Sequence, residues 1–213
     1  SQQPSHAPAK AVQRFGFGSE TGIDVPGEKT GFLPTAEWKE KKFGERWYIG
    51  DTYHASIGQG FVLATPLQLA DATSAVANGG TLWKPRVVGQ IRDRDGTLRS
   101  MAPEALRRNV IDPSILKTVR EGMRMTVTES VGTAQSLAGL PVAVAGKTGT
   151  AQFGTEKKTH GWFESFAPYE HPTIVLVVLI EGQENEGYFA VPVTKDVLSW
   201  YFGEGRGKEA ERE

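Results

Sequence analysis

The stretch Val142-Ala-Val-Ala-Gly-Lys-Thr-Gly-Thr-Ala-Gln152 joins a short apolar run to a segment that carries one cation and two hydroxyl groups. Its start, Val142–Ala145, has the length and composition of a strand. Two further runs of this kind follow, His160–Phe166 and Thr173–Ile180, after polar or proline-containing turns. Three adjacent strands of one antiparallel sheet are the simplest arrangement. The pattern therefore predicts a sheet with Lys147 directly after its first strand.

Two helices are predicted before this sheet. Thr65 can cap a helix that begins at Pro66 and ends near Asn78, because Gly79-Gly80 follows. Asp112-Pro113 gives the same start signal for a second helix, which should run to about Val127. In this helix, apolar residues recur at helical spacing and form one stripe. The stripe consists of Ile115, Leu116, Val119 and Met123.

A hairpin and a closing helix complete the predicted elements. Lys84–Gly89 and Gln90–Leu98 have the pattern of two short strands, and Asp95-Gly96 is a turn signal. Val193–Phe202 is rich in apolar residues and predicts a helix packed against the sheet. The sequence thus favours a mixed α+β class.

The 213 residues suit one domain over 11–203. Residues 1–10 are polar and contain proline, so we expect a disordered segment or linker there, and no signal peptide or membrane anchor. Residues 204–213 are charged and glycine-rich, and we expect a frayed tail. The apolar run Thr173–Ile180 is far shorter than the ~20 residues that a membrane-spanning helix needs.

Composition excludes several function classes. The formal net charge is −1, so no global positive field predicts nucleic-acid binding. The absence of cysteine excludes thiolate metal sites, thiol nucleophiles and disulfides. The histidines show no metal-ligand spacing, and neither a metal nor a cofactor is indicated. These histidines are His6, His54, His160 and His171.

The segment Lys147-Thr148-Gly149-Thr150 offers the chemistry of a carboxylate site. Lysine and threonine side chains can hold a carboxylate by charge-assisted hydrogen bonds. Gly149 lets a ligand lie close to the strand as an extra strand. The first three residues of this segment, Lys-Thr-Gly, also occur as Lys29-Thr30-Gly31, but no strand pattern precedes that copy. We therefore interpret Lys147 as functional and Lys29 as a solvated loop residue.

Several further motifs occur along the chain in a fixed order. They are Phe15-Gly-Phe-Gly18, Thr21-Gly-Ile-Asp-Val-Pro-Gly-Glu28, Gly50-Asp-Thr52, Ser56-Ile-Gly-Gln-Gly60, Ala64-Thr-Pro-Leu-Gln-Leu69, Ala77-Asn-Gly-Gly80, Gly146-Lys-Thr-Gly-Thr-Ala-Gln152 and His160-Gly-Trp-Phe163. In these motifs and their order, the sequence resembles the class B penicillin-binding proteins, in particular the elongation type. Lys-Thr-Gly is itself one motif of penicillin-binding proteins and serine β-lactamases.

The resemblance implies part of a transpeptidase fold, with an antiparallel sheet flanked by helices. It implies a D,D-transpeptidase whose serine attacks the D-Ala-D-Ala end of a peptidoglycan stem peptide and passes the acyl group to an amine. β-Lactams trap the acyl-enzyme. Lys147, Thr148, Gly149 and Thr150 would bind the substrate, and the backbone N–H of Thr150 would form half of the oxyanion hole.

The resemblance also implies a setting and partners. The protein would take part in cell-wall synthesis and in determining cell shape. It would do so at the outer face of the bacterial cytoplasmic membrane, tethered by an anchor outside this chain. Its partners would be the N-terminal remainder of the domain and a membrane glycosyltransferase. Two alternatives stay open, namely a non-catalytic peptide-binding module and a D,D-carboxypeptidase or β-lactamase of the same fold.

The expected nucleophile motif, Ser-x-x-Lys, and the Ser-x-Asn that follows it lie before the Phe15 region in the family and are absent here. Ser114-Ile-Leu-Lys117 matches the first pattern, but eleven serines and twelve lysines give roughly 0.6 matches by chance. We expect Asp112 to cap a helix there and Lys117 to point to water. Ser56 is expected in a structural turn. His160 is expected to begin a strand rather than act as a general base.

Overall fold

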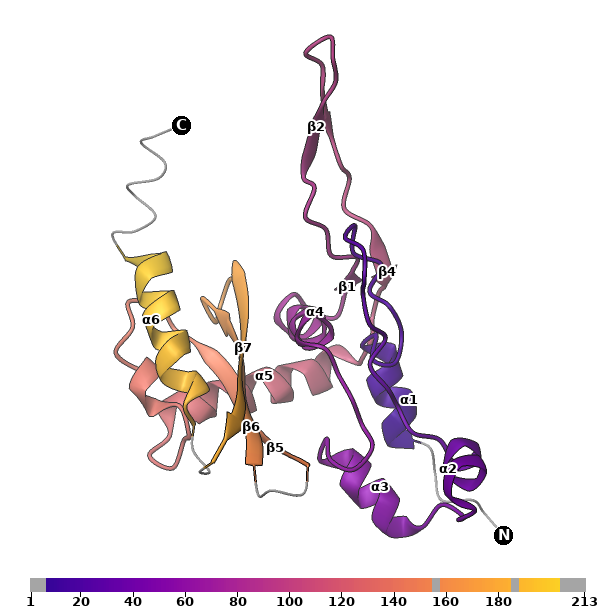
Figure 1. The fold of residues 1–213 in the computed structure, drawn as a ribbon. Helices are drawn as coiled ribbons and strands as arrows, with labels where there is room; N and C mark the ends of the chain where they lie inside the picture. The colour runs from indigo at the N-terminus through magenta and orange to yellow at the C-terminus, as the bar shows by residue number, and fades with distance from the viewer. Residues whose placement is uncertain (1–6, 155–157, 185–187, 204–213) are drawn as a thin grey trace. The chain divides into compact units, whose positions relative to one another are not determined.

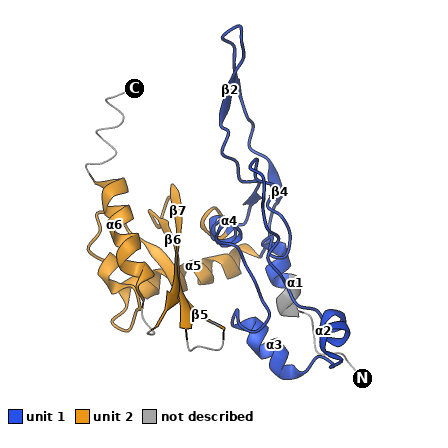
Figure 2. Ribbon diagram, viewed as in Figure 1, with its two compact units in different colours: residues 1–75, 80–111 blue, residues 76–79, 112–213 orange. Residues whose placement is uncertain are grey.

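The computed structural model describes residues 7–154, 158–184 and 188–203. The chain divides into two compact units, whereas its length suggested one (Figure 2). Unit 1 comprises residues 1–75 and 80–111, and unit 2 comprises 76–79 and 112–213. Helix α1 begins at Ala7, so residues 7–10 are helical where a linker was expected. The expected tail, 204–213, lies outside the described residues.

A three-stranded antiparallel sheet forms the centre of unit 2 (Figure 1). Its strands are β5 (Ala145–Phe153), β6 (Lys158–Ala167) and β7 (Ile174–Gln183), in the order β5-β6-β7. The prediction of three adjacent antiparallel strands is confirmed. The first strand, however, begins where the prediction ended it. Lys147 therefore lies inside β5 rather than after it, because polar residues of β5 continue the ladder with β6.

Helices cover the two faces of this sheet. One face packs against helix α6 (Ala190–Phe202) and the 3-10 turn η1 (Gln135–Leu137). The core on this face includes Val127, Leu137, Val144, Phe163, Ala167 and Leu198. On the other face, Ala145 and Phe166 pack against Met123 of helix α5 (Pro113–Thr128). The closing helix that was predicted over Val193–Phe202 is α6, which begins slightly earlier.

Helix α5 begins as its cap signals predict. The Asp112 carboxylate accepts a hydrogen bond from the Ser114 backbone N–H at 2.8 Å, and Pro113 occupies the first turn. The buried apolar residues are Leu116, Met123 and Val127. Ile115 and Val119, which were predicted to share their stripe, are 50% and 40% exposed. Spacing alone does not fix how far the helix is rotated towards its core.

Unit 1 contains four helices and two small sheets among its described residues. The helices are α1 (Ala7–Arg14), α2 (Ala36–Phe43), α3 (Ile49–Ser56) and α4 (Pro66–Ala77), whose last two residues belong to unit 2. Strand β1 (Leu82–Trp83) pairs with β4 (Ala105–Arg107), and β2 (Gln90–Arg92) pairs with β3 (Leu98–Ser100). The helix predicted from Pro66 to about Asn78 is confirmed as α4.

The hairpin was predicted with the right turn but the wrong strands. Asp95-Gly96 does lie in the turn, yet the paired strands are β2 and β3 on either side of it. Lys84–Gly89, predicted as a strand, has no strand partner in the described part of the chain. The backbone N–H groups of Val87 and Val88 in this segment donate to the Asp24 carboxylate instead, at 2.7 and 2.9 Å. Among the described helices, none is long and apolar enough to cross a bilayer.

Candidate active-site strand

Strand β5 lies at the edge of its sheet, since β6 is its single partner among the described strands. The sequence-predicted residues occupy the middle of β5. In register, Lys147, Thr148, Gly149 and Thr150 lie opposite Glu164, Phe163, Trp162 and Gly161 of β6. The four residues are therefore held in one extended segment, and the other edge of that segment is open to a ligand strand within the described structure.

Strand geometry places Lys147 and Gly149 on one face of this segment and Thr148 and Thr150 on the other. Lys147 is exposed, and its ammonium donates a hydrogen bond to the carbonyl of Thr148. The Thr148 side chain is only 8% exposed. Thr150 is exposed. The segment thus presents a cation and a hydroxyl to solvent, while Thr148 fixes it to the body of unit 2.

Thr133 is the anchor of Thr148, and the sequence reasoning missed it. The two hydroxyl oxygens lie 2.9 Å apart and share a hydrogen bond. Thr133 stands in Gly132-Thr133-Ala134, which repeats the Gly-Thr-Ala of residues 149–151. Gly132 is required there, because an added Cβ would collide with the Thr126 carbonyl.

Two glycines of β5 have different reasons to be glycine. An added Cβ at Gly146 would collide with the Phe163 ring and the Glu164 carbonyl. At Gly149 an added Cβ would meet only the Cβ of Trp162, at an ordinary 3.4 Å. Packing therefore demands glycine at 146 but not at 149. Open space at Gly149 is what a close-lying ligand needs.

Two arginines of α5 support the sheet that contains this strand, and the sequence reasoning did not single them out. The Arg124 guanidinium donates to the Val144 carbonyl at 2.7 Å. Arg120 donates to the carbonyls of Ala77 and Tyr169, and it lies over the Phe166 ring at 4.8 Å from the ring centroid. Arg124 thus holds the chain as it enters β5, and Arg120 holds the end of β6 and the residues that follow it.

His160 lies in β6, opposite Ala151, at an irregularity in the pairing between β6 and β7. Its Nδ1 accepts a hydrogen bond from the Gly182 backbone N–H at 3.3 Å. A ring nitrogen that accepts from the backbone is committed to holding the strands together. His160 was expected to begin a strand, but β6 begins slightly earlier, at Lys158.

The two serines considered as nucleophiles bond to groups other than lysine. Ser114 donates its hydroxyl to the Asp112 cap, and Lys117 pairs with Glu121 at 3.9 Å, with 79% of its side chain exposed. Ser56 is the last residue of α3, and its hydroxyl donates to the Thr52 carbonyl at 2.7 Å. Ser114 and Lys117 thus have the structural roles expected from the sequence. Ser56 was expected in a turn, but it lies at the end of a helix.

A pair of carboxyl groups in unit 1 was also missed. Glu28 accepts hydrogen bonds from the backbone and hydroxyl of Thr21, each at 2.6 Å. Asp71 of α4 is 8% exposed, and burial together with the charge of Glu28 raises its pKa to about 7. No group of three or more histidine and acidic residues suited to a metal ion occurs in the described ranges.

Known proteins of one family resemble this chain. Residues 4–199 match the penicillin-binding protein transpeptidase domain. The peptidoglycan D,D-transpeptidase MrdA of Haemophilus influenzae is 32% identical over 210 residues, which are 91% of this chain and 32% of that protein. The chain thus spans about a third of the length of the curated relatives that it matches.

Solved structures agree with the sequence match. Penicillin-binding protein 2 of Pseudomonas aeruginosa, in complex with WCK 5153, superposes with a TM-score of 0.75 at 34% identity, covering 91% of this chain and 43% of that one. Penicillin-binding protein 2 of Helicobacter pylori, solved in a complex with MreC, gives a TM-score of 0.71 at 32% identity, covering 89% and 34%.

Proposed function

Because the chain belongs to the penicillin-binding protein transpeptidase family, and within it to the class B enzymes of the penicillin-binding protein 2 type, we propose that it forms part of a peptidoglycan D,D-transpeptidase. Its role there is to supply the strand that holds the donor stem peptide and the β-lactams that imitate it. The observation that carries this proposal is the position of Lys147-Thr148-Gly149 in the middle of an edge strand.

Each residue of β5 has a chemical role in this proposal. The Lys147 ammonium and the hydroxyls of Thr148 and Thr150 bind the terminal carboxylate of the donor. Gly149 leaves space for the peptide backbone, which the open surroundings of an added Cβ support. The bond between Thr148 and Thr133 keeps the strand in one position, so the carboxylate site is preformed.

The backbone N–H of Thr150 forms half of the oxyanion hole in this proposal. Backbone groups two residues apart point to the same side of a strand. The Thr148 carbonyl accepts a hydrogen bond from the Lys147 ammonium, which supports an orientation towards the open edge. Thr150 shares that orientation. The N–H of Thr150 is then placed to stabilise the negative oxygen of the tetrahedral intermediate.

We place the serine nucleophile outside the 213 residues. Ser114 and Ser56 each donate their hydroxyl to a structural acceptor, which leaves neither arranged for attack with a lysine base. In the family, Ser-x-x-Lys supplies both groups. The proposal also places the protein at the outer face of the cytoplasmic membrane, with a glycosyltransferase partner. The solved complex of the Helicobacter pylori relative makes an MreC-type protein a further partner.

A fluorescent penicillin tests the position of the nucleophile. The 213-residue chain and a longer protein that includes the Ser-x-x-Lys segment are each incubated with the probe, denatured and separated by electrophoresis. We expect covalent label on the longer protein alone, and peptide mapping should place it on a serine outside residues 1–213. Label on Ser56 or Ser114 of the short chain would contradict the proposal. Binding of the probe by the longer protein without any covalent label would favour a non-catalytic peptide-binding module.

A further inference from the structure

The hairpin of β2 and β3 projects from the rest of unit 1 and has no role in the proposed carboxylate site (Figure 1). All the residues of both strands are exposed. A two-stranded ribbon of this kind is marginally stable by itself in water. The hairpin therefore needs contacts near its ends to remain folded. Its exposed side chains and backbone groups also need an explanation.

The stem of the hairpin is held from outside the ribbon. Asp24 accepts hydrogen bonds from the backbone N–H groups of Val87 and Val88, and these bonds lower the pKa of its carboxyl group. The Arg86 guanidinium donates to the carbonyl of Met101 on the opposite arm. The two arms are thus tied together and to the loop that carries Asp24.

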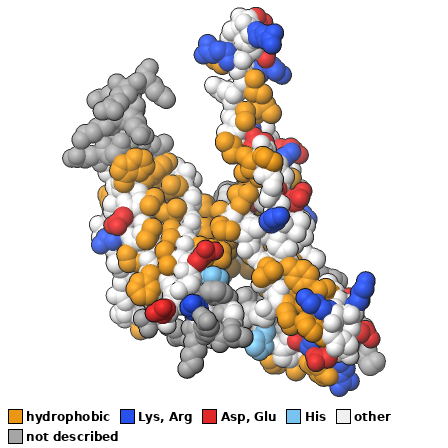
Figure 3. Space-filling view, viewed as in Figure 1, with side chains coloured by type: hydrophobic (Ala, Val, Ile, Leu, Met, Phe, Trp, Pro, Cys, Tyr) orange, Lys and Arg blue, Asp and Glu red, His pale blue; other side chains and the backbone are white. Residues whose placement is uncertain are grey.

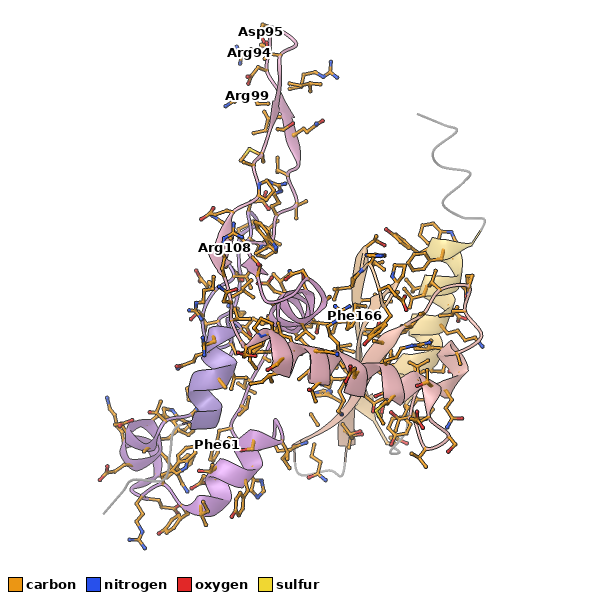
Figure 4. The ribbon with its side chains drawn as sticks, turned by 180° about the vertical axis from the view of Figure 1, so that it is seen from behind. Phe61, Arg94, Asp95, Arg99, Arg108 and Phe166 are labelled. Atoms are coloured by element: carbon orange, nitrogen blue, oxygen red, sulfur yellow. The ribbon has the colours of Figure 1, made fainter. Side chains whose placement is uncertain are left out.

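The turn is also fixed. Arg99 and Asp93 form a bidentate pair, with nitrogen to oxygen distances of 2.8 and 3.1 Å. The Asp95 carboxylate accepts from the Thr97 backbone N–H at 2.9 Å. Figure 4 shows Arg94 and Asp95 at the far end of the hairpin, with Arg99 nearer the stem. Both ends of the ribbon are therefore preorganised, which lowers the entropy cost of binding.

The hydrogen-bond pattern identifies the backbone groups that face outward. Met101 donates its N–H to the Gly89 carbonyl, and Asp93 donates to the Thr97 carbonyl, both at 2.9 Å. Bonded and non-bonded pairs alternate in an antiparallel ladder, so odd-numbered residues form the bonded pairs. Even-numbered residues then turn their N–H and C=O groups to the open edges. These residues are Gln90 and Arg92 on β2, and Leu98 and Ser100 on β3.

The side chains give the two faces of β2 different characters. Ile91 lies on one face of β2, opposite Arg99 of β3, and its side chain is 38% exposed. Arg92 lies on the opposite face and has no ion pair among the described residues. Arg94, which lies in the turn, has no ion pair among the described residues either. Figure 3 shows hydrophobic side chains along the arms and charged ones at the end of the hairpin.

We propose that the outer edge of β2 is a docking site for an extended segment of a partner protein in which acidic and apolar residues alternate. The segment adds a third strand, and it pairs with the outward backbone groups of Gln90 and Arg92. Its acidic side chains lie on the face of Arg92, and its apolar side chains lie on the face of Ile91. Arginine and methionine are also enriched at protein interfaces.

The charges of the turn favour a protein partner over an anionic membrane. Between Arg92 and Arg99 there are three arginines and two aspartates, so the net positive charge is small. Each basic residue near an anionic membrane surface contributes only about 1 kcal/mol. An ordered third strand instead satisfies the backbone groups of the edge.

A labelled peptide of four Glu-Val repeats, acetylated and amidated, tests the proposal by fluorescence anisotropy with the 213-residue chain. We expect binding that weakens at least tenfold in Gln90→Pro, because proline removes the outward N–H without breaking the ribbon. Ser100→Pro is the matched control, since it blocks the edge of β3 and should bind as the wild type does. Equal loss in both variants, or in neither, would overturn the proposal.

Charge reversal provides a second test that does not use proline. The Arg92→Glu, Arg94→Glu double variant should lose the Glu-Val peptide at least tenfold and gain binding to a Lys-Val peptide of equal length. Circular dichroism verifies that each variant is folded. Vesicles of phosphatidylglycerol and phosphatidylethanolamine are measured in parallel. Binding to vesicles without binding to the peptide, or no binding to either, would overturn the proposal.

Discussion

The two copies of Lys-Thr-Gly share their side chains and differ in everything around them. In the copy at 147–149 the threonine is 8% exposed and bonded to Thr133. In the copy at 29–31 both Lys29 and Thr30 are exposed, and the Thr30 hydroxyl donates to the adjacent Gly31 carbonyl. One copy lies in an edge strand and the other in a loop. The two copies thus have the same composition but different surroundings, and the binding role that we propose for one of them rests on its strand register.

The glycines of the two copies differ in the same way. Gly31 has φ of +63°, and an added Cβ would collide with the Leu63 carbonyl and press on the Gln68 amide. Gly149 has neither constraint, because an added Cβ meets only Trp162 at an ordinary distance. Folding therefore requires glycine at position 31. Folding does not require glycine at position 149, where a bound ligand can be the reason for it.

Exchanging each glycine for alanine should separate the requirement of folding from that of binding. Of the substitutions proposed here, Gly31→Ala should have the largest effect on stability. Gly31→Ala should lower the free energy of unfolding by about 2 kcal/mol or more, from positive φ and the backbone collision. Gly149→Ala should change it by less than about 1 kcal/mol. Urea denaturation measures both. Equal destabilisation by the two variants would contradict the comparison.

The threonines offer a smaller contrast of the same kind. Thr148→Val leaves the half-buried Thr133 hydroxyl without its partner and should cost about 1 kcal/mol of stability. Thr30→Val, at an exposed position, should stay within about 0.5 kcal/mol of the wild type. Combining Thr148→Val with Thr133→Val should cost less than the sum of the single changes, because both remove one bond. Additive costs in this double-mutant cycle would show that the bond does not contribute.

A pH-dependent effect on stability concerns Asp71, which lies near Glu28 and thus close to the loop copy. Its pKa in the folded state, about 7, lies above its ordinary value of 3.8. Between these two values the folded state binds more protons than the unfolded state, so stability should fall as pH rises from about 4 to about 7. Asp71→Asn should flatten this dependence. Thermal denaturation across that pH range measures it, and an unchanged slope in the variant would contradict the assignment.

Much of unit 2 was predictable because its signals are local. The Asp112 cap and Pro113 fix the start of α5. In the last third of the chain, short apolar runs separated by turns identify three strands. The polar part of β5 was harder to assign, because Lys147 and Thr150 have no strand pattern of their own. They are extended because β6 lies beside them in register, and a single sequence does not display that partner.

The supports of the candidate site could not be identified by pattern alone. Thr133 is distant from Thr148 along the chain, and only the fold brings their hydroxyls together. Arg124 looked like one of several charged residues on a helix, yet it binds the Val144 carbonyl. The residues that we propose to bind a ligand directly carry a motif. The residues that position them are defined by tertiary contacts, which have no short-range signature.

The central claim is that the Lys-Thr-Gly copy of β5 holds the ligand and the loop copy does not. The most direct measurement is the rate at which a fluorescent penicillin acylates a longer protein that contains both this chain and the Ser-x-x-Lys segment. Lys147→Ala should lower the second-order rate about 10- to 100-fold, the value of a hydrogen bond to a charged group. Lys29→Ala should leave it unchanged. A wild-type rate in Lys147→Ala, or an equal loss in Lys29→Ala, would contradict the account.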